Sequence, residues 1–153
     1  MRGDVLVSNQ LHTFLNQQVA NFAVLTEKLH HFHYYVNGTS FFTLHNELRE
    51  EFKYSFERVD DFSERLLMVG GKPITSLKEY LEHTTLVENQ KEFKDAQSML
   101  ETVIKDYTQL VSELKTGIEL ADAANDPVSE DFFIGIITYF EDRIWQFKSF
   151  LGK

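Results

Sequence analysis

Apolar residues recur at intervals of three and four along most of the chain, which is the period of one face of an α-helix. The first such run extends from Leu11 to Val36, and Asn37-Gly38 ends it. A second run begins after the N-cap candidate Ser40 and stops at Gly70-Gly71, which predicts a helix of about 28 residues.

The second half of the chain repeats this pattern after a long connection. Residues Ser76 to Glu79 have the spacing of a capping box, so we expect a short helix inside the connection, which continues to about Glu92. A third long helix is predicted from about Glu92 to Thr116, before Gly117, and a fourth from Asp126-Pro127 to Leu151. This order of elements predicts a single all-α domain over residues 1–153: a ferritin-like four-helix bundle with a short helix in the long crossover.

Composition narrows the chemistry that this fold can carry. The chain has no Cys, which excludes disulfides, thiolate nucleophiles, Cys zinc sites and iron–sulfur clusters. Any metal must therefore be held by His and carboxylates. The net charge of −9 disfavours direct binding to DNA phosphates, and no apolar run approaches the ~20 residues that span a bilayer. We expect a soluble, cytoplasmic protein with no membrane partner.

Four polar residues interrupt the apolar stripe of the second long helix. At 100° per residue, His45, Arg49, Asp60 and Glu64 fall on or beside that stripe. A carboxylate among apolar side chains is costly unless an opposite charge or a metal accompanies it. The pattern therefore predicts a partner for these acids, which could be Arg, His or iron.

A second copy of the chain could supply that partner. His45 and Asp60 are about 22 Å apart along one helix, too far to share a metal. In an antiparallel pair about a two-fold axis, His45 would face Glu64 and Arg49 would face Asp60, because both residue pairs have the same midpoint. The spacing fits either two identical inter-subunit metal sites or an interface network of salt bridges in which Arg49 pairs with the acids.

The first long helix offers one further ligand candidate. His33 lies on the flank of the apolar stripe, about 40° from Leu29, whereas His31 faces away. Glu27 and His30 have the Glu-x-x-His spacing of di-iron bundles, but no second helix repeats it, so we do not expect an intrachain di-iron centre.

Taken together, these residues resemble the Dps family of ferritin-like mini-cages, the DNA-binding proteins from starved cells. The resemblance spans nearly the whole chain. It rests on residues 29–36 (LHHFHYYV) with Gly38, 41–45 (FFTLH), 60–66 (DDFSERL) and 70–73 (GGKP). It implies a hollow dodecamer, built from two-fold dimers, whose members oxidise Fe(II) with hydrogen peroxide or oxygen and store ferric iron as protection against oxidative stress.

The resemblance also implies roles for individual residues. His33 and His45 of one subunit would face Asp60 and Glu64 of another, and together bind and oxidise iron. Two positions depart from the family pattern: Tyr34 stands where a Trp usually follows the first ligand His, and Arg49 stands where an acidic ligand is expected. Because a guanidinium cannot bind a cation, we expect weaker or slower iron oxidation than in a complete site.

Acidic residues near the last turn resemble the lining of the family's pores. Asp122, Asp126 and Asp131 would draw Fe(II) toward the cavity, and helix capping is the rival explanation. The first ten residues carry Arg2 as their single basic residue, so the basic tail that often binds DNA is absent there. Three functions remain: an iron-oxidising storage protein, a metal-sequestering cage with weakened catalysis and, least supported, a DNA-protecting nucleoid protein.

Overall fold

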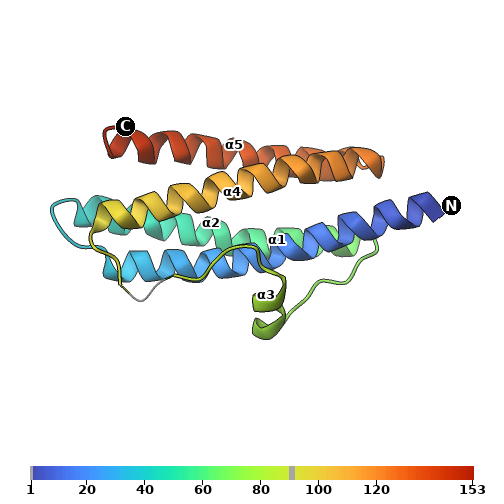
Figure 1. Ribbon diagram of the computed structural model, residues 1–153, viewed down its shortest axis with the longest axis horizontal. Coiled ribbons are helices and arrows are strands. Elements are labelled where there is room, and N and C mark those ends of the chain that lie inside the picture. The colour runs from blue at the N-terminus through green and yellow to red at the C-terminus, as the bar shows by residue number, and fades with distance from the viewer. Residues whose placement is uncertain (1, 90–91) are drawn as a thin grey trace. The chain divides into compact units, whose positions relative to one another are not determined.

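The computed structural model describes residues 2–89 and 92–153, and within these ranges the chain is α-helical without any strand (Figure 1). None of the described helices is long and apolar enough to cross a membrane. The chain divides into two compact units, one formed by residues up to Phe14 with Leu100–Lys153 and the other by Leu15–Met99. The described helices are α1 (Arg2–Tyr35), α2 (Phe41–Met68), α3 (Leu77–His83), α4 (Ala96–Ala123) and α5 (Pro127–Phe150).

In the unit formed by Leu15–Met99, α1 and α2 lie side by side (Figure 1). Their shared apolar stripe supplies the core: Phe22 and Phe62 are fully buried, with ring centroids 5.1 Å apart. Burying a large apolar side chain of this kind contributes about 1.5–3 kcal/mol. This packing fixes the position of α2, the helix that carries most of the candidate site.

The short helix α3 forms where the capping-box spacing predicted it. The Ser76 side chain accepts a hydrogen bond from the Glu79 backbone N–H, which starts the helix. Two polar residues of α1 hold the following segment. The Asn21 side-chain oxygen accepts from the Thr85 backbone N–H at 2.7 Å, and Lys28 Nζ donates to the Val87 carbonyl at 2.6 Å. The crossover is thus fastened along α1.

The predicted ends of the third long helix were wrong. α4 begins at Ala96, where the Asp95 side chain accepts from the Ser98 N–H at 2.8 Å, and it continues through Gly117 to Ala123. A Cβ at Gly117 would clash with the ring of Phe14, so this glycine allows close packing and does not stop the helix. The start of α5 after the Asp126 cap is confirmed.

The start of α1 was also predicted too late. The helix begins at Arg2, nine residues before Leu11, and its first turns are exposed, with Val5 at 61% and Leu6 at 60%. An exposed helix has no need of a continuous apolar stripe, so periodicity could not detect these turns.

Candidate metal centre

Two histidines that are twelve residues apart in sequence meet where α1 ends and α2 begins. His33 Nδ1 lies 2.7 Å from the His45 carbonyl oxygen, and His45 Nδ1 lies 2.8 Å from the His33 carbonyl oxygen. Their rings are stacked, with centroids 3.8 Å apart and an interplanar angle of 15°. Because a carbonyl can only accept, both Nδ1 atoms must donate, and each neutral ring keeps its lone pair on Nε2. The pair therefore presents two nitrogen atoms suited to a metal.

Aromatic side chains enclose this histidine pair. Phe52 packs edge-on against His33 at 5.2 Å, and Phe41 stacks on His45 at 4.9 Å. His33 is only 5% exposed. Burial lowers the pKa of His33, and the nearby His45 and Arg49 act in the same direction, whereas the hydrogen bond to His45 opposes it. The arrangement favours the neutral imidazole, which is the form that binds metals.

Arg49 lies one helical turn after His45 and contacts the imidazole ring of His45. Its Nη2 atom is 3.4 Å from His45 Nε2, and its Nη1 atom is 3.3 Å from the Asn46 side-chain oxygen. Arg49 is half-buried. The departure from the family pattern is thus part of the site, because this guanidinium reaches a nitrogen that could bind metal.

The two acids of α2 differ from the histidines. Asp60 and Glu64 are exposed, and within the part of the chain that the structure describes neither has a hydrogen bond or an ion pair. The prediction that they lie on a buried stripe is wrong for the single chain. The apolar face of α2 is wider than the core it covers, since Phe56 and Leu67 on that face are also exposed, at 68% and 58%.

The described residues of one chain do not form a complete metal site. Across residues 2–89 and 92–153, no three His, Asp or Glu side chains are grouped closely enough to hold an ion. Glu27 and His30 of α1 also contact each other, with 3.3 Å between Glu27 Oε1 and His30 Nδ1. Among the described residues, no further His, Asp or Glu side chain joins them to make a group of three. The histidines and the acids remain at separate positions along α2.

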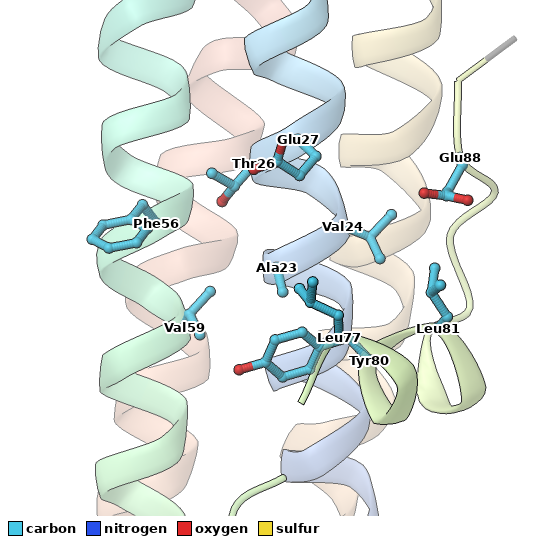
Figure 2. A pocket seen from close by; sticks show the side chains of 10 residues that line it. All are labelled: Ala23, Val24, Thr26, Glu27, Phe56, Val59, Leu77, Tyr80, Leu81 and Glu88. Carbon is cyan, nitrogen blue, oxygen red and sulfur yellow. The ribbon is translucent and has the colours of Figure 1, made fainter. Parts of the chain in front are cut away.

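Sequence reasoning missed an apolar cavity of about 610 Å³ against α2. Figure 2 shows that α1, α2 and α3 all contribute to its wall. Phe56 and Val59 of α2 also line a second hollow, which contains Asp60. The sequence signal that could have revealed this surface is the pair of leucines, Leu77 and Leu81, one turn apart on the short helix α3. Both are exposed in the structure. The lining residues are Ala23, Val24, Thr26, Glu27, Phe56, Val59, Leu77, Tyr80, Leu81 and Glu88.

Asp122, Asp126 and Asp131, the acids near the connection between α4 and α5, have different surroundings. Asp122 and Asp131 are exposed. Asp126 caps α5: its carboxylate accepts from the Ser129 N–H at 3.0 Å and from the Ser129 hydroxyl at 2.5 Å. The capping explanation is therefore confirmed for Asp126, and the pore role of all three stays a prediction.

Two aromatic residues named by sequence lie at the surface. Tyr34 is 68% exposed, and its ring centroid is 5.5 Å from that of His33. It therefore borders the histidine pair without covering it. Trp145 of α5 is 65% exposed.

Comparison with known proteins agrees with this architecture. A family model described as a ferritin-like domain matches residues 13–153. The DNA protection during starvation protein 2 of Bacillus anthracis is 40% identical over 147 residues, which cover 96% of this chain and 100% of the relative. The general stress protein 20U of Bacillus subtilis is 40% identical over 95% of this chain and 100% of the relative. The crystal structure of Dps from Staphylococcus aureus is 42% identical, with a TM-score of 0.90 over 94% of this chain and 95% of that one. The chain has the ferritin-like fold and belongs to the Dps family.

Proposed function

We propose that the protein oxidises Fe(II), with hydrogen peroxide as the oxidant, at sites formed between two copies of the chain. In this proposal the ferric product is stored in a homo-oligomeric cage, a dodecamer built from two-fold dimers. The supporting observation is the contrast between the preformed pair of His33 and His45 and the two exposed acids of α2, which have no hydrogen bond or ion pair within the described ranges. The histidine pair is one half of the proposed site and offers nitrogen ligands, and the two acids are the other half and offer oxygen ligands.

An antiparallel pair of α2 helices would bring the halves together. A two-fold axis that sets His45 opposite Glu64 also sets Arg49 opposite Asp60, and it generates each site twice. The exposed apolar surface at Phe56 supports this arrangement, because this residue lines both the apolar cavity and the hollow that contains Asp60, and a second copy would cover it. Assembly would then bury apolar surface and complete the ligand set in one step.

Iron is the substrate of this site. Imidazole nitrogens from His33 and His45 and carboxylate oxygens from Asp60 and Glu64 are ligand types that suit iron. The acids would also offset the positive charge of the ion. Two Fe(II) ions supply the two electrons that, with two protons, reduce one hydrogen peroxide molecule to two water molecules, so no hydroxyl radical is released.

The pore acids belong to the same proposal. The exposed Asp122 and Asp131 would attract Fe(II) toward the cage, while Asp126 would contribute charge in addition to its cap. These acids would attract cations without holding one in place, because no three His, Asp or Glu side chains among the described residues are grouped closely enough to bind an ion.

Protection of DNA needs no contact with DNA in this proposal. The name of the Bacillus anthracis relative refers to DNA protection, and removal of Fe(II) and peroxide would supply such protection chemically. A net charge of −9 opposes phosphate binding. The second candidate is a cage that sequesters metal with little catalysis, and the contact of Arg49 with His45 favours it.

Mixed assemblies of two inactive variants test the inter-subunit site. His33→Ala and Glu64→Ala are each expected to lose iron oxidation. In co-assembled protein, half of the random pairs are mixed and each mixed pair holds one intact site of two, so about a quarter of native activity should return. The measurement is stopped-flow oxidation of anaerobically loaded Fe(II) by hydrogen peroxide.

The control is a mixture of the same two variants that have been assembled separately. That mixture should stay inactive while subunits do not exchange. If co-assembled protein also stays inactive although the native protein is active, the site does not combine His33 and Glu64 from different copies. If the native protein oxidises Fe(II) no faster than the buffer, the metal-sequestering alternative replaces the ferroxidase proposal.

A further inference from the structure

The nitrogen through which His45 could bind a metal already has a partner within the chain. His45 Nδ1 donates to the His33 carbonyl oxygen at 2.8 Å, so in the neutral ring Nε2 carries the lone pair. Arg49 Nη2 lies 3.4 Å from that Nε2 atom and can only donate. The guanidinium therefore points a donor at the lone pair that a metal would use.

The two histidines differ in this respect. Both rings use Nδ1 to reach a backbone carbonyl, but the contact of Arg49 is with the ring of His45. The second guanidinium contact, at 3.3 Å to the Asn46 side-chain oxygen, holds Arg49 on the same turn. Of the two rings, His33 is thus the one whose Nε2 atom is not engaged by the arginine.

We propose that Arg49 competes with the metal ion for Nε2 of His45, so that the bound ion is held by His33 and the acids while His45 remains paired with Arg49. This inference rests on the proposed function, because it concerns the same site. Arg49 is then a specificity-determining residue: it sets how many histidine ligands the substrate ion can use.

The energetics favour the arginine for two reasons. Arg49 is one helical turn from His45 and is permanently charged, so the contact needs little ordering and its donor is present whenever the ring of His45 is neutral. A metal that displaced Arg49 would also leave a cation beside a divalent ion in a partly buried site, where charges are weakly screened. Binding through His45 therefore costs more here than in a site with an acid at position 49.

A double-mutant cycle on the full-length assembled protein tests this competition. The probe is Co(II), titrated calorimetrically without oxygen, because the readout is then binding and not turnover. The variants are Arg49→Leu, His45→Ala and the double variant. His45→Ala keeps the backbone carbonyl that holds His33, and Arg49→Leu keeps a side chain that is compatible with a helix. Arg143→Leu on α5 removes the same charge elsewhere and is the matched control.

The expected result is a strong coupling between the two positions. Arg49→Leu should tighten Co(II) binding by about tenfold or more, because His45 becomes a ligand. His45→Ala should weaken binding by less than about threefold in the native background but by more than about tenfold in the Arg49→Leu background. Arg143→Leu should leave the affinity unchanged within about twofold.

Two outcomes would overturn the inference while leaving the proposed function intact. In the first, His45→Ala weakens Co(II) binding equally in both backgrounds, which means that His45 is a ligand despite Arg49. In the second, Arg49→Leu does not tighten binding, which is expected if Arg49 turns to Asp60 of a second copy on assembly. Failure of every variant to bind Co(II) would instead reject the metal site and, with it, the proposed function.

Discussion

The two ends of α2 carry the two halves of one proposed site, and they are built differently. At the N-terminal end, His45 is locked against His33 by two reciprocal hydrogen bonds and is enclosed by aromatic rings. At the C-terminal end, Asp60 and Glu64 are exposed, without a hydrogen bond or an ion pair among the described residues. In the proposed site, one half is formed within the chain and the other requires a second copy of the chain.

This difference shows which ligands can be held in place by the chain alone and which cannot. The neutral imidazoles can be buried in advance because backbone carbonyls satisfy their Nδ1 donors. Two adjacent carboxylates cannot be buried in advance without a cation, since desolvation would penalise both. A centre that couples the halves through assembly therefore keeps its acids hydrated until a partner and a metal arrive.

The largest effect is expected from His33→Ala, which damages the finished half. Iron oxidation should fall by at least about a hundredfold through loss of a ligand. The free energy of unfolding should also fall by about 1–3 kcal/mol, because the His45 carbonyl loses its buried donor. Stopped-flow oxidation and chemical denaturation measure the two effects. His83→Ala, an exposed histidine of α3, should change neither; an unchanged His33→Ala protein would contradict the preformed pair.

Glu64→Ala tests the other half and should separate activity from stability. We expect iron oxidation to fall by about tenfold to a hundredfold, with the free energy of unfolding unchanged within about 0.5 kcal/mol, because Glu64 is exposed and has no hydrogen bond or ion pair among the described residues. Glu141→Ala on α5 is the control for removal of an acid. A large loss of stability in dilute, unassembled protein would mean that Glu64 already has a structural role.

Phe56→Ala addresses the surface that joins the halves. Phe56 is 68% exposed and lines both the apolar cavity and the hollow that contains Asp60, so its truncation should weaken self-association by about tenfold while the chain stays folded. Analytical ultracentrifugation over a dilution series measures the change. Val5→Ala trims another exposed apolar side chain and serves as the comparison. Equal association of the two variants would remove the cavity from the proposed interface.

The smallest effect is expected at the pore. Asp122→Asn should slow Fe(II) uptake by about twofold to threefold, more strongly at low ionic strength, because a single exposed charge acts through a screened field. Asp142→Asn, on α5, is the matched substitution. If both variants take up iron at the same rate over a range of salt concentrations, Asp122 has no part in ion entry.

Much of the architecture was readable from periodicity, and the failures have physical causes. The extent of α2 and the capped starts of α3 and α5 followed from apolar spacing and capping residues. Gly117 was misread because a glycine's role depends on its neighbour, here the ring of Phe14. The exposed first turns of α1 gave no apolar signal to read.

The features of the candidate site also fall into those that the sequence predicted and those that it did not. The sequence by itself determined the residue types, their order along α2 and the shared midpoint of the two pairs, because helical geometry is local and regular. Only the tertiary structure decided that His33 and His45 bond to each other's backbone, that the acids are exposed and that Arg49 reaches His45 Nε2. Those contacts depend on how α1 and α2 pack and on side-chain rotamers, which no spacing along one helix specifies.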